Sequence, residues 1–194
     1  MAITRLAIFA SGRGTNFAAL QHAIIERQLN AEFVRLIVDH DNIGAIELAI
    51  EFGVPYTVIN YKAYDNRGLA EAAIVAQLQA DTVDGIILAG YMRLLTPVLL
   101  DPFKDRIVNI HPALLPSFPG THGIDDAFNY GVKITGVTVH YVDAGMDTGK
   151  IIAQAPVAIE VDDTLETLEA RIHATEHELY PNTLETLLNE GVFN

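Results

Sequence analysis

Two polar side chains with the chemistry of acyl transfer lie two residues apart in this sequence. Asn109 and His111 belong to the segment 106–116, which begins with the β-branched residues of a strand and is ended by prolines. Residues two apart on an extended backbone face the same side, so the amide and the imidazole project together where the strand leaves its sheet. The amide can donate to a developing oxyanion, and the imidazole can transfer a proton near neutral pH. The plain alternative is a polar strand end covered by water.

An acid that could orient this imidazole lies in a glycine-flanked loop. Asp147 belongs to the segment 143–150, which is longer than a tight hairpin needs. It could be a solvated turn acid or a calcium ligand, although the regularly spaced oxygen ligands of a calcium loop are missing. It could also reach an imidazole such as His111, orient the ring and favour its charged form. His140, on the strand before this loop, is interpreted as a structural histidine or at most a neighbour of the site.

A glycine-rich turn near the N-terminus is typical of an anion site. An apolar run over 5–10 is followed by Ser11-Gly-Arg-Gly-Thr-Asn16 and then by apolar residues at helical spacing. The pattern predicts strand, turn and helix, with Thr15 and Asn16 as N-caps beside the free amides of the first turn. The turn lacks the lysine of a P-loop and the third glycine of a dinucleotide fingerprint. Asp39 could still imitate a ribose-binding acid, so this region alone does not exclude NAD.

A second ligand wall is indicated after the apolar run 84–89. Gly90-Tyr-Met-Arg-Leu-Leu95 combines a glycine, apolar residues and one arginine, which could form a pocket wall or a loop that packs into the core. Arg67 opens another predicted helix, with Asp65 as its N-cap. It is an ordinary surface arginine unless a carboxylate or phosphate lies nearby.

A metal-like motif lies near the C-terminus. His173-Ala-Thr-Glu-His177 matches the inverted zincin pattern, in which two histidines one helical turn apart could bind zinc. The match is short, Glu178 and Tyr180-Pro181 crowd the next turn, and no helix with a third ligand follows. We therefore expect no metal site and interpret Glu176 as a hydrogen-bond acceptor for a substrate amine or hydroxyl group.

The elements that must position these groups alternate between strands and helices. Strands are expected at 5–10, 33–38, 56–59, 84–89 and 106–111, with helices between them, and an antiparallel pair is expected at 133–142 and 151–157. A long helix should follow a capping box from Asp163 to Glu166 and break near Pro181. We predict an α/β fold with a mostly parallel central sheet and an antiparallel C-terminal strand pair, as one domain over residues 1–194.

The composition limits the partners of the protein. Of the 194 residues 50% are hydrophobic, none is cysteine, and the formal net charge is −13. Nucleic acids and anionic membranes need a basic face, so neither is an expected partner, whereas backbone amides and one or two arginines could hold a small anion. Without cysteine there are no disulfides and no thiolate chemistry. The N-terminal apolar run is too short for a signal peptide and no segment could span a membrane, so a cytoplasmic location is expected.

Together these motifs resemble the phosphoribosylglycinamide formyltransferases, the folate-dependent enzymes of purine synthesis. The resemblance covers essentially the whole chain. Its marks are Ser11-Gly-Arg-Gly-Thr-Asn16, Leu88-Ala-Gly-Tyr-Met-Arg-Leu-Leu95, Asn109-Ile-His-Pro-Ala-Leu-Leu-Pro116, Gly136-Val-Thr-Val-His140, Asp147-Thr-Gly149 and Glu176-His-Glu-Leu-Tyr-Pro181. It implies a three-layer Rossmann-like formyltransferase fold. It also implies transfer of the formyl group of 10-formyltetrahydrofolate to the amine of glycinamide ribonucleotide.

The resemblance implies a role for each site residue. The catalytic trio would be Asn109, His111 and Asp147, and no metal would be needed. The ribonucleotide and its phosphate would be held by Gly14, Thr15, Asn16 and Glu176, and the folate by Arg67, Met92, Arg93, Leu94, Leu95 and Asn109. The role of His173 stays open, because relatives often carry Gln or another polar residue there. The segment 121–125 also differs from the His-x-His sequence that is commoner in this family.

Other activities stay open at this point. The Asn-x-His and Asp set is shared with formyltetrahydrofolate hydrolases, which usually carry an additional N-terminal domain and lack the phosphate turn. It is also shared with methionyl-tRNA formyltransferases, which carry an additional C-terminal domain and bind a polyanion that suits a chain of charge −13 poorly. A non-catalytic nucleotide-binding module is a further alternative. The expected partners are small-molecule substrates, and we expect a monomer or a weak homodimer.

Overall fold

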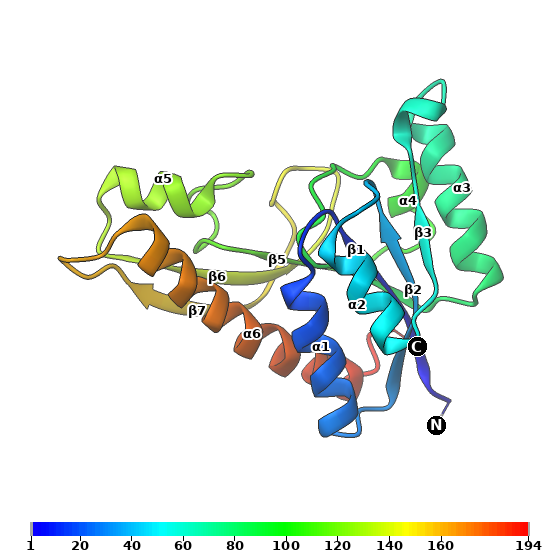
Figure 1. Ribbon diagram of the computed structural model, residues 1–194, viewed down its shortest axis with the longest axis horizontal. Coiled ribbons are helices and arrows are strands. Elements are labelled where there is room, and N and C mark those ends of the chain that lie inside the picture. The colour runs from blue at the N-terminus through cyan, green and yellow to red at the C-terminus, as the bar shows by residue number, and fades with distance from the viewer. Residues whose placement is uncertain (1, 194) are drawn as a thin grey trace.

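A seven-stranded sheet of order β3-β2-β1-β4-β5-β6-β7 forms the centre of the computed structural model, which describes residues 2–193 (Figure 1). Its strands are β1 (Thr4–Ala10), β2 (Ala31–Val38), β3 (Tyr56–Val58), β4 (Gly85–Leu88), β5 (Ile107–His111), β6 (Ile134–Tyr141) and β7 (Ile151–Ala158). The first five strands are parallel to one another, whereas β6 is antiparallel to both β5 and β7. The predicted fold class is therefore confirmed.

Helices cover both faces of the sheet, which gives three layers. They are α1 (Thr15–Glu26), α2 (Gly44–Phe52), α3 (Arg67–Ala80), α4 (Pro97–Leu100), α5 (Gly123–Tyr130) and α6 (Leu165–Asn189), with a 3-10 turn, η1, at Tyr61–Ala63. One apolar cluster lies between the sheet and helices α1, α2 and α6, and a second lies between the sheet and helices α3 and α4. The β4 strand is buried throughout, as expected of a parallel strand covered on both faces.

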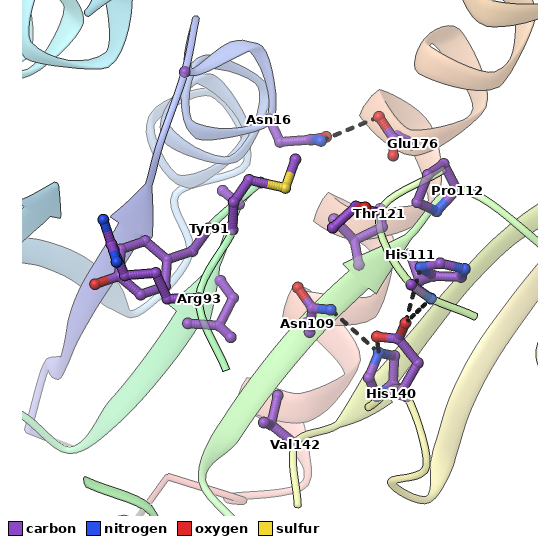
Figure 2. Close-up of a pocket in the computed structure, with 18 of the residues that line it drawn as sticks. Asn16, Tyr91, Arg93, Asn109, His111, Pro112, Thr121, His140, Val142 and Glu176 are labelled. Atoms are coloured by element: carbon purple, nitrogen blue, oxygen red, sulfur yellow. Dashed lines mark hydrogen bonds and ion pairs between the residues drawn. The ribbon is translucent and has the colours of Figure 1, made fainter. Parts of the chain in front are cut away.

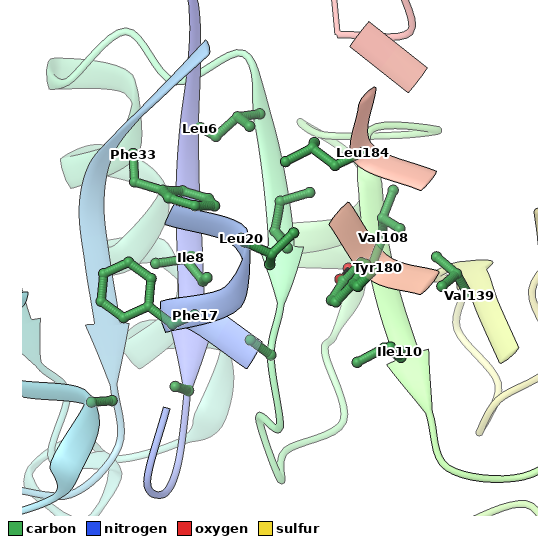
Figure 3. Packing of buried hydrophobic residues seen from close by; sticks show 14 of the residues in the cluster. Leu6, Ile8, Phe17, Leu20, Phe33, Val108, Ile110, Val139, Tyr180 and Leu184 are labelled. Atoms are coloured by element: carbon green, nitrogen blue, oxygen red, sulfur yellow. Dashed lines mark hydrogen bonds between the residues drawn. The ribbon is translucent and has the colours of Figure 1, made fainter. Parts of the chain in front are cut away.

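Helix α6 connects the core to the strands that carry the candidate site. Tyr180 is fully buried among Leu20, Leu184 and Val108, in the apolar cluster between the sheet and helices α1, α2 and α6 (Figure 3). Its hydroxyl lies 2.9 Å from the carbonyl oxygen of Leu88 and 3.1 Å from that of Val108. A buried tyrosine needs such a partner for its O–H group. The contact fixes α6 against β4 and β5, the two strands whose ends carry the predicted folate wall and the catalytic pair.

Several predicted helix ends are wrong. The N-cap of α1 is Gly14 in the left-handed conformation, with φ +78°, not Thr15 or Asn16. A Cβ at Gly14 would lie 2.9 Å from the Ala45 Cα, so a capping side chain has no room there. The α3 helix is capped by Asn66 instead of Asp65, which is one residue later than predicted.

The C-terminal helix also differs from the prediction. Thr164 and Thr167 form the capping box of α6, one residue after the predicted Asp163 and Glu166. The helix continues through Pro181 instead of breaking there. Pro181 is buried beside Tyr180, so the packing of the helix against the sheet holds a residue that would otherwise interrupt it. Over the described residues 2–193, every helix is too short or too polar to cross a bilayer.

Candidate active site

A cavity of about 380 Å³ opens where β1 and β4 end side by side. After β1 the chain runs outward to β2 and β3, and it returns on the other side of β1 to form β4, so the strand order reverses between these two strands. Ligands in open α/β sheets bind at such switch points. The residues that line the cavity come from the turn 12–16, the segment 88–95, the end of β5, the loop 143–147 and helix α6. Nearly all the predicted site residues therefore face one space.

The end of β5 carries the first two predicted catalytic residues. Asn109 and His111 both line the cavity, as their spacing on the strand predicts (Figure 2). The His111 side chain is buried, with only 3% of the residue exposed. Its Nε2 lies 2.8 Å from the carbonyl oxygen of Phe118, and its Nδ1 lies 3.5 Å from Oδ2 of Asp147. A carbonyl oxygen can only accept, so Nε2 carries a proton, and Nδ1 faces the Asp147 carboxylate.

Asp147 reaches this imidazole from the loop between β6 and β7. It adopts φ +54°, a left-handed conformation that is uncommon for a residue other than glycine. Its Oδ2 accepts a hydrogen bond of 2.7 Å from the backbone N–H of Gly120. The 3.5 Å separation from His111 Nδ1 exceeds an ordinary hydrogen bond, so this N–H can be shared with a substrate atom. Strained conformations held by surrounding contacts are frequent at functional sites.

The structure brings His140 closer to the reacting groups than the sequence indicates. In the antiparallel register of β5 and β6, His140 lies directly opposite Asn109. Its Nε2 is 3.2 Å from Nδ2 of Asn109 and 3.6 Å from Oδ1 of Asp147. Burial lowers the pKa of His140 below its ordinary value, although the carbonyl of Tyr141 and the charge of Asp147 oppose the shift. The sequence places His140 at most near the site, because only the strand register brings it beside Asn109.

The opposite end of the cavity is the start of α1. Gly14, Thr15 and Asn16 line it, and α1 is a helix of twelve residues whose first amides lack partners within the helix. Such a helix start attracts anions through its N–H groups and its dipole. Asn16 is buried, and its Nδ2 donates a 3.2 Å hydrogen bond to Oε2 of Glu176 on α6 (Figure 2). The turn and the long helix therefore meet at this end, as the predicted ribonucleotide site requires.

Glu176 also accepts a hydrogen bond from His173, one turn earlier on α6. The Nδ1–Oε2 distance is 2.8 Å, and this bond raises the pKa of His173 against the opposing effect of burial. Both residues line the cavity, whereas His177 does not. The two histidines of the zincin-like motif therefore differ in their surroundings. His173 is bound to Glu176, whereas burial lowers the pKa of His177. Within residues 2–193, no cluster of three His, Asp or Glu side chains is arranged to hold a metal ion.

The predicted folate wall is exposed to the cavity, but its arginines have partners within the protein. Arg93 donates from Nε to Oδ2 of Asp39 at 2.7 Å, and its guanidinium lies 4.3 Å from the centre of the Tyr61 ring. Burial raises the pKa of Asp39, but hydrogen bonds from neighbouring side chains outweigh it and leave the pKa below its ordinary value. The side chain of Asp39 is only 2% exposed, so the alternative of a ribose-binding acid is disfavoured.

Other residues of the wall are more accessible. Met92 and Leu94 are 64% and 49% exposed, while Leu95 is buried. Arg67 does not line the cavity and donates to the carbonyl oxygen of Leu94 at 3.2 Å. It therefore supports the backbone of the wall from outside. Gly120 and Thr121 also line the cavity, which gives the region after β5 a direct place in the site.

Comparisons with known proteins agree with this geometry. The family model described as formyl transferase matches residues 4–184. The chain is 46% identical over 184 residues to the phosphoribosylglycinamide formyltransferase of Bacillus subtilis, covering 95% of this chain and 94% of that protein. It is 43% identical to the enzyme of the same name from Mycobacterium tuberculosis, covering 97% and 86%.

Comparison with solved structures identifies the same family. The crystal structure of phosphoribosylglycinamide formyltransferase from Bacillus halodurans superimposes with a TM-score of 0.94 at 48% identity, over 97% of both chains. Glycinamide ribonucleotide transformylase 1 from Geobacillus kaustophilus superimposes with a TM-score of 0.93 at 48% identity, over 96% of this chain and 99% of that one. The similarity thus extends across all the segments that form the cavity.

Proposed function

The chain belongs to the formyl transferase family, and from that premise we propose that it formylates the amine of glycinamide ribonucleotide with 10-formyltetrahydrofolate. The products are formylglycinamide ribonucleotide, an intermediate of purine (IMP) synthesis, and tetrahydrofolate. One observation carries the assignment of the site: Asn109, His111 and Asp147 converge at one end of a cavity whose other end is the open start of a helix. The whole chain, 1–194, is taken as one formyltransferase domain.

The two substrates occupy different parts of the cavity in this proposal. The phosphate of the ribonucleotide binds the amides of Gly14, Thr15 and Asn16, and Glu176 accepts a hydrogen bond from the same substrate. The folate lies along the wall of residues 92–95, where Met92 and Leu94 offer exposed apolar surface. Arg93 and Arg67 stabilise this wall through Asp39 and the Leu94 carbonyl, so their effect on folate binding is indirect. Asn109, between the two ends, touches the transferred group.

The chemical step is an attack of the amine nitrogen on the formyl carbon. A new C–N bond forms, and the carbonyl electrons move to oxygen, which becomes an oxyanion on a tetrahedral carbon. The Nδ2 of Asn109 and the Nδ1 of His111 donate to this oxyanion. These donors are already in place before reaction, so little reorganisation opposes the step. When the intermediate collapses, the bond to N10 of the folate breaks and the formyl C=O is restored.

The same step requires a proton transfer. The attacking amine becomes positively charged and must lose one proton, and the departing N10 must gain one. The charged His111 can give its Nδ1 proton to the departing N10 and then regain one from the attacking amine, directly or through water, while Nε2 stays bound to the Phe118 carbonyl. Asp147 favours the charged imidazolium and keeps its ring in position. The net charge of the reacting atoms is the same before and after the step, and no covalent enzyme intermediate forms.

The wider setting follows from the substrates and the charge. Both substrates are small anionic molecules, and with a formal charge of −13 we expect no nucleic-acid partner. We expect the protein to act in the cytoplasm, as a monomer or weak homodimer. Sedimentation at micromolar concentration distinguishes these two states.

One assay tests the proposed reaction. Purified protein is mixed with 10-formyltetrahydrofolate, with and without glycinamide ribonucleotide, and tetrahydrofolate and formylated product are both quantified. Release of folate that requires the ribonucleotide and equals product formation is the expected result. Release without the ribonucleotide would indicate a formyltetrahydrofolate hydrolase. Binding of the ribonucleotide without release of folate would indicate a non-catalytic nucleotide-binding module.

A further inference from the structure

His140 makes a contact that the proposed chemistry has not yet used. It lies on β6 directly opposite Asn109 on β5, and its Nε2 is 3.2 Å from the Asn109 Nδ2. Only 2% of His140 is exposed, so water does not compete freely for this nitrogen. Both side chains line the cavity, and Figure 2 shows the contact between them. An imidazole held this closely against an oxyanion donor can determine how that donor is presented.

The second ring nitrogen of His140 fixes its tautomer. Nδ1 lies 2.8 Å from the carbonyl oxygen of Tyr141, which can only accept a hydrogen bond. Nδ1 therefore carries the proton. In the neutral ring Nε2 then has a free lone pair, and it can accept one of the two N–H bonds of the Asn109 amide. The other N–H bond of that amide stays available to a substrate oxygen.

We propose that neutral His140 is a positioning residue for formyl transfer, which orients the Asn109 amide so that its nitrogen, and not its oxygen, faces the oxyanion. The proposal rests on the proposed function, because it assumes that Asn109 donates to the transferred formyl group. If His140 instead carried a proton on Nε2, two donors would face each other. The amide would then turn its oxygen toward His140, and the oxyanion would lose a donor.

The charged groups around His140 influence whether its Nε2 is protonated, and this protonation affects turnover. Asp147 and Asp143 reach it from the β6–β7 loop and favour the charged ring, and His111 on β5 opposes it. Burial is the largest influence and lowers the pKa of His140, so the neutral acceptor is present at neutral pH. On acidification, protonated His140 would also attract Asp147, whose Oδ1 is 3.6 Å away, from His111. Both effects reduce turnover in acid.

Two substitutions separate positioning from simple packing. His140→Ala removes the acceptor, and we expect kcat to fall about tenfold while KM for the ribonucleotide changes little. His140→Gln offers an amide oxygen that does not titrate and that reaches the position of Nε2, so it should recover most of the lost kcat and remove the part of the acid limb that is due to His140. His22→Ala, an exposed histidine on α1 outside the cavity, is the matched control. Equal losses for both His140 variants, with an unchanged acid limb, would overturn the proposal.

A double-mutant cycle then asks whether His140 acts through Asn109. In the Asn109→Ala background we expect His140→Ala to cause no further loss of kcat, because the group that it positions is gone. The same loss in both backgrounds would mean that His140 acts independently, which contradicts the proposal. If Asn109→Ala itself retains normal turnover, the assignment of Asn109 in the proposed function fails instead. The two failures are therefore distinguishable.

A measurement on the unmodified protein covers the case in which a variant does not fold. The 15N chemical shifts of His140 distinguish a protonated from an unprotonated ring nitrogen. At neutral pH we expect Nδ1 to be protonated and Nε2 unprotonated, with a coupling across the hydrogen bond to the Asn109 amide nitrogen. A protonated Nε2 at neutral pH would contradict the proposal without any substitution.

Discussion

The two ends of the cavity are assembled in different ways. The phosphate end is built mainly from one continuous turn, Gly14 to Asn16, with Glu176 as the remote contributor. The catalytic end is assembled from β5 and the segment 118–120 that follows it, together with the loop between β6 and β7, whose Asp147 is 27 positions beyond Gly120. One end is thus a local property of the chain, and the other depends on the whole C-terminal half of the sheet.

This difference indicates how each end contributes to turnover. Backbone amides at a helix start hold a substrate anion equally well before and during the reaction, so losing them should raise KM. Donors aimed at an oxyanion act only when that charge develops, so losing them should lower kcat. Substitutions at the two ends should therefore change different kinetic constants.

His111→Ala should have the largest effect. We expect kcat to fall by about 10³-fold, since both an oxyanion donor and the proton carrier are lost. The affinity for the ribonucleotide, measured by calorimetry, should stay within a few-fold, because the phosphate end is untouched. Circular dichroism and thermal melting check the fold. A variant with near-normal kcat would remove His111 from the chemistry.

Asp147→Asn should have the next largest effect. The amide keeps the size of the side chain but cannot favour the charged imidazolium, so we expect kcat to fall on the order of 10²-fold with little change in KM. Asp162→Asn, an exposed acid after β7, is the matched control. A change confined to KM would place Asp147 among the binding groups and would break the proposed separation of the two ends.

Glu176→Gln tests the opposite end. Asn16 and His173 both donate to Oε2, which the amide oxygen can replace, but the NH2 group would then stand in place of Oε1 and could not accept from the ribonucleotide. We therefore expect KM for the ribonucleotide to rise roughly tenfold while kcat changes little. Glu178→Gln, an exposed acid on the same helix, should have no effect. A large fall in kcat without a change in KM would contradict the assignment of Glu176 to binding.

His173 provides the smallest and most specific test. Its pKa is raised by Glu176, so the protonated pair stabilises the fold fully below the unfolded pKa of histidine, about 6.5. This contribution is lost as the pH rises through the folded pKa. The difference in Tm between the wild type and His173→Gln should therefore shrink above neutral pH. Glu176→Gln should lower the pKa of His173 in an NMR titration, and an unchanged pKa would refute the coupling.

Much of the fold and part of the site could be predicted from the sequence. The parallel strands, the glycine turn and the pairing of Asn109 with His111 on one strand face depend on local patterns, and the structure has them. The helix caps were harder, because the tight contact of Gly14 with Ala45 decides where α1 begins, and no local pattern reports it. The N-caps of α3 and α6 lie one residue after the predicted positions, but both helices were predicted.

The remaining features depend on long-range packing. The place of His140 beside Asn109 follows from an antiparallel register between residues 31 positions apart. The pairing of Arg93 with Asp39 joins the ends of two segments 54 positions apart, and it gives a predicted ligand residue a partner within the protein. Sequence patterns identify such residues as polar and well placed, but only the fold assigns their partners.

The most direct test of the central claim is a crystal structure with glycinamide ribonucleotide and a folate analogue that cannot transfer its formyl-like group. The account predicts the phosphate on the amides of residues 14–16. It also predicts the substrate amine and the carbonyl carbon of the analogue in contact between Asn109 and His111, with Asp147 beside the Nδ1 of His111. A phosphate bound elsewhere, or a carbonyl group that contacts neither Asn109 nor His111, would contradict it.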